Sequence, residues 1–204
     1  MHPHKILISA HTLSNVFRPT YFPTMGMIIL LTCSYLSLLP LSIKAWLLAM
    51  TYLFTVAIPV VFCWIYRNTA KKYFSHFSQR HKRTGPYCIH LLSYMAGMHY
   101  LQMWHMPRCL IAIIFISLLV QAIGVVVNLW WKVSMHSAGA GAVIGGLAAY
   151  AELFDFNPVW WLCMAILLAG LVMSAQCILR RNTLAQVTGG CLIGIVCGYF
   201  GVVA

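Results

Sequence analysis

Charged residues are scarce in this sequence, and acidic residues are almost absent. Only 7% of the 204 residues are charged, and Glu152 and Asp155 are the two acids beside 13 Lys and Arg. Soluble globular domains carry about a quarter charged residues, whereas 62% of this chain is hydrophobic and its mean hydropathy is +0.85. The composition excludes an ordinary soluble domain and predicts a chain that is solvated by lipid.

The sequence also has no C-x-x-C spacing. Its eight Cys lie in or beside apolar stretches, which is typical of small buried side chains and not of disulfides or metal ligands. Residues 1–23 hold two Lys or Arg and no sustained apolar run. We therefore expect no cleavable signal peptide there and interpret these residues as an interfacial lead-in.

Long apolar runs fill most of the remaining chain. A helix needs about 20 apolar residues to cross a hydrocarbon core about 30 Å thick. The apolar runs, divided at charges and prolines, predict seven spans: 24–43, 45–66, 87–104, 109–131, 137–154, 158–179 and 184–204. Lys44 alone separates the first two, and Pro40 supplies the turn of a helical hairpin over 24–66. We expect an all-α, polytopic transmembrane bundle of six to seven spans, forming one membrane-embedded domain over residues 1–204.

Cations gather on one side of this predicted topology. With seven spans, the N-terminus and the loops after the second, fourth and sixth spans share a side that holds eleven of the 13 Lys and Arg. Because cytoplasmic loops are enriched in Lys and Arg, we expect an integral protein of the inner (cytoplasmic) membrane with its cationic face in the cytoplasm. Much of this charge falls in 67–86, interpreted as a solvated loop. Arg83, beside a turn expected at 84–86, is its best candidate for a site.

Two polar turns on this face carry groups suited to anion binding. Lys132, Ser134 and His136 precede or open the fifth span, and a second cationic turn precedes the seventh. The first turn of a helix offers free N–H groups and the positive end of its dipole, which favour phosphate. Small residues that let two membrane helices pack closely recur every four positions in both spans, at Gly141, Gly145 and Ala149 and at Gly190, Gly194 and Gly198. Packing of these spans would bring the two turns together.

These segments resemble the motifs of a known family. Residues 132–136 are Lys-Val-Ser-Met-His, and residues 181–187 are Arg-Asn-Thr-Leu-Ala-Gln-Val. They are similar to the K-x-S-x-H and R-H-T-x-x-Q-V motifs in the bacterial branch of the type 2 phosphatidic-acid phosphatase superfamily. The resemblance covers residues 80–204, which would form a phosphatase-like core. Arg83 with Pro86 is a looser match to the first motif of that family.

The resemblance implies a helical enzyme that removes phosphate from a lipid or isoprenoid phosphate without a metal or other cofactor. In that mechanism a His of the third motif attacks phosphorus, a partner orients it, and the His of the second motif protonates the leaving oxygen. The implied partners are a lipid or polyprenyl phosphate and the membrane, with no nucleic acid. The implied roles are His136 as acid, Gln186 as orienting partner, and Arg83, Lys132, Ser134, Gln176, Arg180 and Arg181 as phosphate-binding positions.

The chain departs from the family at two of these positions. Asn182 stands at the nucleophile position, and Gln176 stands where the family has Arg. An amide nitrogen is a poor nucleophile because its lone pair is delocalised, although Arg180 or Arg181 would replace the charge missing at Gln176. Three interpretations remain open. The chain binds without cleaving, or it uses His136 as nucleophile with water or Lys132 as proton donor, or it carries an engineered inactivating change.

Three classes of function follow from these residues. The first is a membrane phosphatase, a phosphoric monoester or diphosphate hydrolase. The second is a non-catalytic binder, or pseudo-phosphatase, that holds the same headgroup. The third and least favoured is a small transporter, because the sequence shows no internal repeat and its two acids lie near a span end.

Overall fold

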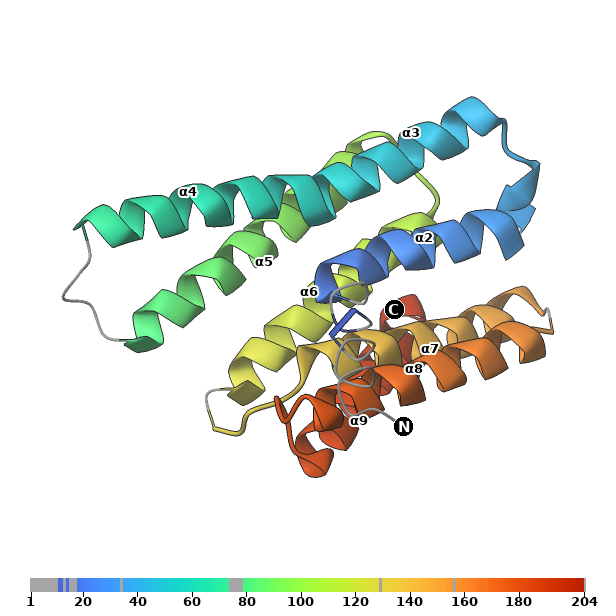
Figure 1. The fold of residues 1–204 in the computed structure, drawn as a ribbon. Coiled ribbons are helices and arrows are strands. Elements are labelled where there is room, and N and C mark those ends of the chain that lie inside the picture. The colour runs from blue at the N-terminus through green and yellow to red at the C-terminus, as the bar shows by residue number, and fades with distance from the viewer. Residues whose placement is uncertain are drawn as a thin grey trace. The chain divides into compact units, whose positions relative to one another are not determined.

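The computed structural model describes residues 11, 12, 14, 18–33, 35–73, 79–128, 130–155 and 157–203 (Figure 1). These residues contain helices and no strand, which confirms the predicted all-α class. The α-helices are α2 (Phe22–Cys33), α3 (Leu41–Tyr52), α4 (Ile58–Tyr73), α5 (Gln79–Met103), α6 (Arg108–Asn128), α7 (Met135–Phe154), α8 (Val159–Ile178) and α9 (Leu184–Val203).

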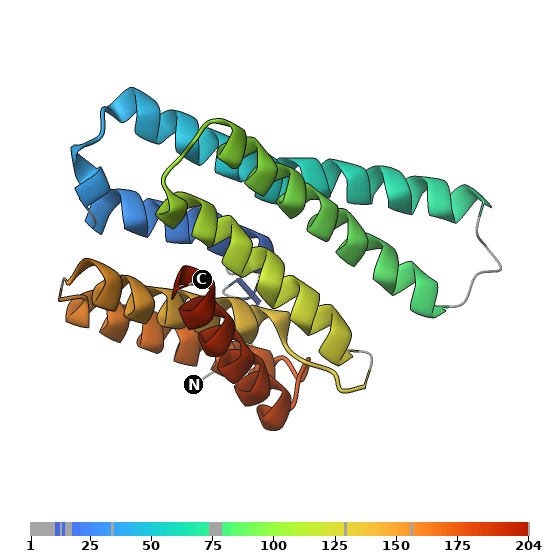
Figure 2. The ribbon, with the colours of Figure 1, turned by 180° about the vertical axis from the view of Figure 1, so that it is seen from behind.

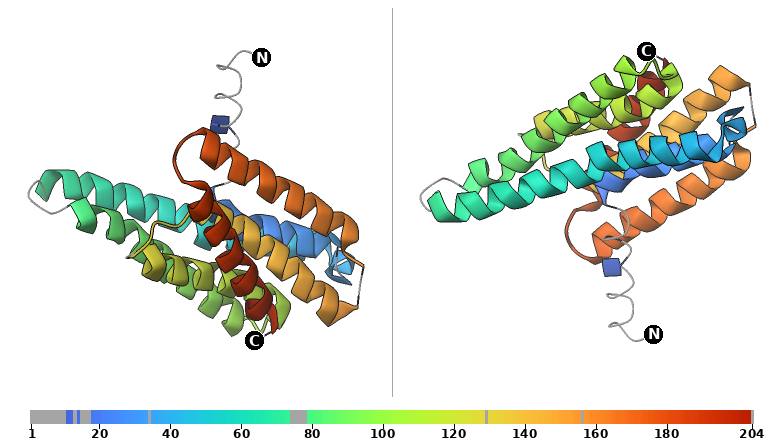
Figure 3. Two further views of the ribbon diagram at one scale, coloured as in Figure 1. Left: turned by 90° about the horizontal axis from the view of Figure 1, so that it is seen from below. Right: turned by 90° about the horizontal axis from the view of Figure 1, so that it is seen from above.

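The chain divides into two compact units. Unit 1 comprises Met1–Phe22 and Leu119–Ala204, and unit 2 comprises Pro23–Leu118. In unit 1, α7 packs against both α8 and α9, and Figure 3 shows α9 crossing α7. In unit 2, α4 lies along α5, as Figure 2 also shows.

A π-helical turn, η3 (Leu53–Ala57), joins α3 to α4 in unit 2 and produces one long helix. Such a turn leaves backbone carbonyls without their usual intrahelical partners. The Ser93 hydroxyl of α5 donates to the Phe54 carbonyl, and the buried Thr55 hydroxyl donates to the Thr51 carbonyl at 2.7 Å. These hydroxyl groups thereby provide hydrogen bonds to backbone carbonyls in and beside the irregular turn, inside an apolar unit.

Among the described residues, five helices are long and apolar enough to cross a membrane: Leu41–Tyr66, Arg108–Asn128, Met135–Phe154, Val159–Ile178 and Leu184–Val203. They correspond to the second, fourth, fifth, sixth and seventh predicted spans and indicate a membrane protein. The first predicted span is broken, because α2 has 12 residues, or about 18 Å at 1.5 Å per residue. The 25-residue α5 includes His90, His99 and Gln102 and is not among the five. A count of six or seven spans stays a prediction.

Two expectations for residues 67–86 need correction. The helix α4 continues to Tyr73 and α5 begins at Gln79, so most of the expected loop is helical; residues 74–78 lie outside the described part. The turn expected at 84–86 is wrong, because Pro86 lies inside α5. A proline removes one backbone donor, and membrane helices tolerate this loss where neighbouring groups satisfy the freed carbonyl. Arg83 is thus a helical residue.

Two smaller expectations had different outcomes. Pro40 is extended, with φ −55° and ψ 144°, and directly precedes α3, so the chain leaves the helical conformation where the turn of the hairpin was predicted. Burial of the cysteines holds for Cys109, Cys191 and Cys197, whereas Cys88 and Cys163 are exposed. Most of the predicted lead-in over residues 1–23 lies outside the described residues, but Ser14 is described and buried.

Candidate functional site

The helices α7 and α9 approach one another closely along their small residues. A Cβ atom built on Gly141 would lie 2.2 Å from the Cys191 carbonyl oxygen, and one on Gly194 would lie 2.0 Å from the Ala138 carbonyl oxygen. Real Cβ contacts are never this short, so the two backbones touch because side chains are missing there. The predicted pairing of the fifth and seventh spans is confirmed.

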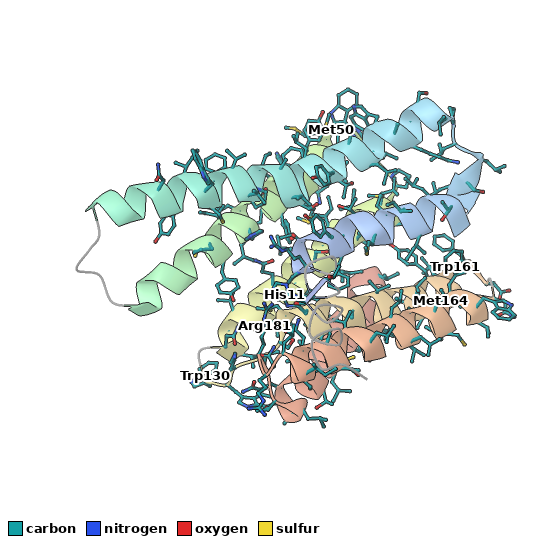
Figure 4. The ribbon with its side chains drawn as sticks, in the orientation of Figure 1. His11, Met50, Trp130, Trp161, Met164 and Arg181 are labelled. Carbon is teal, nitrogen blue, oxygen red and sulfur yellow. The ribbon has the colours of Figure 1, made fainter. Side chains whose placement is uncertain are left out.

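Two hydrogen bonds join the turn before α7 to the turn before α9. The Lys132 ammonium donates to the Arg181 carbonyl at 2.6 Å, and the Ser134 N–H donates to the Gln186 carbonyl at 3.3 Å. The two helices therefore run in the same direction, with their positive dipole ends at one end of unit 1. Figure 4 shows Arg181 and Trp130 at this end and Trp161 and Met164 at the other.

Ser134 begins α7 as its N-cap. Its side-chain oxygen accepts the Ser137 N–H at 3.5 Å, and the Ser137 hydroxyl donates back to the Ser134 carbonyl at 2.8 Å. Both residues are buried, and the neighbouring Val133 N–H donates to the Asn128 side-chain oxygen at 2.9 Å. The turn that carries Lys132 and His136 is thus fixed to the ends of two helices.

Helix α8 ends in a Schellman-type turn that presents Arg181. The Arg180 N–H donates to the Cys177 carbonyl at 3.0 Å, and the Arg181 N–H donates to the Gln176 carbonyl at 3.2 Å. Arg180 adopts the left-handed conformation with φ 50°, which costs a non-glycine residue about 1 kcal/mol. Both Arg side chains are exposed.

The turn before α9 contains one of the two hydrogen bonds of a capping box. The Gln186 side-chain oxygen accepts the Thr183 N–H at 3.1 Å, and the Val187 N–H donates to the Thr183 carbonyl at 3.1 Å. Asn182 interacts with the other glutamine of the site, because its amide nitrogen donates to the Gln176 side-chain oxygen at 3.4 Å. The structure thus gives Gln186 a capping contact and places the amide of Gln176 beside Asn182.

Ser14 lies at the centre of these side chains. Its hydroxyl oxygen accepts hydrogen bonds from the Gln176 amide nitrogen and from the Arg181 guanidinium, both at 3.1 Å. The His136 imidazole lies near the Ser14 backbone and within reach of the Arg181 charge. The sequence pattern did not indicate Ser14, because it belongs to no motif and lies more than 100 positions from its partners.

The structure brings most of the predicted site residues together. Unit 1 places them at the joined N-terminal ends of α7 and α9: Lys132, Ser134, His136, Gln176, Arg180, Arg181, Asn182 and Gln186. Arg83 belongs to α5 of unit 2, and its side chain lies outside the described part, so its place in the site stays a prediction.

This cluster has the chemistry of an anion cradle. One ammonium, two guanidiniums, three amides, one imidazole and two hydroxyls surround the joined turns, and most of these groups can donate hydrogen bonds. Both acids of the chain lie at the opposite end of α7, where the Tyr199 hydroxyl donates to Glu152 at 2.6 Å. The described residues contain no group of three or more His, Cys, Asp or Glu able to hold a metal.

No protein-family model, curated protein or solved structure matches this chain.

Proposed function

We propose that this chain is an integral membrane protein of six to seven spans that holds the phosphate headgroup of a lipid or isoprenoid phosphate between the first turns of α7 and α9. The observation that supports it most directly is the bond from the Lys132 ammonium to the Arg181 carbonyl, which joins the two cationic turns. Two parallel helix dipoles then add positive potential at the same place.

Each group of the cradle has a role in this proposal. The guanidinium of Arg181 has five N–H donors, of which one bonds Ser14, so it can also bind phosphate oxygens. Lys132 and Arg180 are exposed and add charge at the mouth of the site. His136 is the proton donor to a leaving oxygen in the phosphatase-like version of the mechanism.

The second part of the proposal concerns catalytic activity, which depends on the residue at position 182. At the position of the nucleophile the chain has an amide that donates to Gln176 at 3.4 Å. A hydrogen-bonded carboxamide does not attack phosphorus, so Asn182 cannot be the nucleophile. The imidazole that the cradle offers for catalysis is that of His136. The headgroup binder is therefore the function that the geometry supports best. The lipid phosphatase is the second candidate, which the position of His136 favours.

The proposed membrane is the inner (cytoplasmic) membrane of a bacterium, with the cradle on the cytoplasmic face. The excess of Lys and Arg on that side of the predicted topology supports this orientation. A phospholipid headgroup in the cytoplasmic leaflet would then reach the cradle directly.

Binding of dioctanoyl phosphatidic acid to the purified protein tests the binder. We expect saturable thermal stabilisation by this lipid and none by dioctanoylglycerol. Lys132→Ala and Arg181→Ala should each raise the Kd by about tenfold or more, because each removes a charged donor. Lys44→Ala and Arg108→Ala are the matched controls, since both lie on the opposite side of the predicted topology, and they should leave the Kd unchanged. Equal loss in all four variants would contradict the proposal.

Phosphate release by the same protein tests the enzyme. We expect no turnover from the present sequence and measurable turnover from Asn182→His, increased by adding Gln176→Arg and abolished by His136→Ala. Turnover by the unaltered chain that His136→Ala abolishes would instead make it an active phosphatase. If the restored variants bind the lipid and release no phosphate from phosphatidic acid or an isoprenyl diphosphate, the phosphatase-like version fails.

A further inference from the structure

Ser14 occupies the position in the cradle where an anion oxygen would lie. Two donors of the proposed headgroup site, the Gln176 amide nitrogen and the Arg181 guanidinium, converge on its hydroxyl oxygen at 3.1 Å each. A hydroxyl oxygen has two lone pairs, so these two bonds use its full capacity as an acceptor. A phosphate oxygen accepts donors in the same way.

Ser14 and Gln176 are both buried, so the contact between them is closed to solvent. Ser14 is 2% exposed and Gln176 is 1% exposed. Asn182 donates to the Gln176 side-chain oxygen, which turns the Gln176 amide nitrogen toward Ser14. A headgroup can therefore contact Gln176 only after Ser14 has moved away, whereas Lys132 and Arg180 remain open to solvent.

We propose that the Ser14 hydroxyl is an internal stand-in for the phosphate headgroup, so that Ser14 and the headgroup compete for Gln176 and Arg181. This inference rests on the proposed function, because it concerns the regulation of that same site. The exposed cations make the first contact with the headgroup, and displacement of Ser14 completes its binding. Any event that withdraws Ser14 from Gln176 raises the affinity of the cradle for phosphate.

Two substitutions at Ser14 with opposite expected signs test this competition in the full-length protein. Ser14→Ala removes the competing acceptor and frees the buried Gln176 amide and the Arg181 guanidinium for the headgroup, so the Kd for dioctanoyl phosphatidic acid should fall about fivefold to tenfold. Ser14→Asp places a carboxylate against Arg181, so the Kd should rise about tenfold. Ser174→Ala, at an exposed serine on the same helix as Gln176, should change nothing.

The outcomes separate this inference from the proposed function. If the unaltered protein binds the lipid through Arg181 and Ser14→Ala binds it equally or more weakly, Ser14 is a positioning residue and the competition is wrong. If no variant binds the lipid, the proposed function fails and the inference fails with it. Thermal unfolding of each variant verifies folding. A parallel titration with inorganic phosphate shows whether the Gln176 and Arg181 donors, once released from Ser14, bind free phosphate as well as a lipid headgroup.

Discussion

Gln186 lies in the first turn of α9, and its side-chain oxygen accepts the Thr183 N–H at 3.1 Å. The spacing Thr-x-x-Gln is that of a capping box, in which the third helical residue reaches back to the N-cap. The same side chain was expected to orient residue 182, but the 3.4 Å contact of Asn182 is made with Gln176. One short motif thus combines a helix start with a candidate site.

Substitution of Gln186 separates its capping contact from headgroup binding. Gln186→Ala removes the acceptor for the Thr183 N–H and should lower the free energy of unfolding by about 1 kcal/mol. Gln186→Glu keeps an acceptor at the same place and adds favourable charge at a helix N-terminus, so it should retain stability while weakening headgroup binding through charge repulsion. Thermal unfolding and lipid titration measure the two effects. Equal stability of both variants would show that the cap contributes little.

The seam between α7 and α9 consists of glycines facing backbone carbonyls. Gly141 and Gly145 of α7 face Cys191 and Ile195, and Gly194 and Gly198 of α9 face Ala138 and Ala142. Both sets recur every four residues, so each forms one stripe along its helix. This close approach holds the two polar turns at the same level and makes the cradle a product of helix packing.

Gly194→Ala should destabilise unit 1. The new methyl group would lie 2.0 Å from the Ala138 carbonyl oxygen, which is backbone and cannot rotate away. We expect a loss of about 2 kcal/mol or more, with weaker headgroup binding as the turns separate.

Gly170→Ala provides the matched control for that substitution. Gly170 lies within α8, and a Cβ atom built there meets nothing within 4 Å. Because alanine favours helix, this variant should be neutral or slightly more stable. Thermal unfolding in detergent compares the two variants, and equal melting temperatures would contradict the close packing.

For the molecule as a whole, the distribution of charge predicts which side of the membrane carries the cradle. The turn at 180–183 and the turn at 155–158 lie at opposite ends of neighbouring helices, because α8 connects them. The first turn holds Arg180 and Arg181, whereas the second begins at Asp155 and lies three residues after Glu152. From the positive-inside rule we therefore expect residues 180–183 to lie in the cytoplasm.

Labelling of engineered cysteines in intact cells tests this orientation. Asn157→Cys and Thr183→Cys both introduce a thiol at an exposed position. A membrane-impermeant maleimide should label residue 157 above the background of the unaltered chain, and it should label residue 183 only after the cells are permeabilised. Labelling of residue 183 in intact cells would reverse the proposed topology.

The sequence by itself determined the all-α class, the five long apolar helices and the packing of α7 on α9. Composition, apolar run length and the four-residue spacing of Gly141 and Gly145 are local properties, and lipid leaves a chain few ways to satisfy its backbone except helices. The segment around Pro86 was mispredicted, because helix formation near a proline depends on neighbours that a local pattern does not contain.

The tertiary structure alone decided which side chains meet within the cradle. Ser14 contacts Gln176 and Arg181 across more than 160 positions of sequence, and no periodicity encodes such a contact. Likewise, Asn182 donates to Gln176 and not to Gln186, because the Schellman-type turn at Arg180 reverses the chain between residues 176 and 182. Residue types set the chemistry that is present, whereas the path of the backbone determines which groups lie within hydrogen-bonding distance.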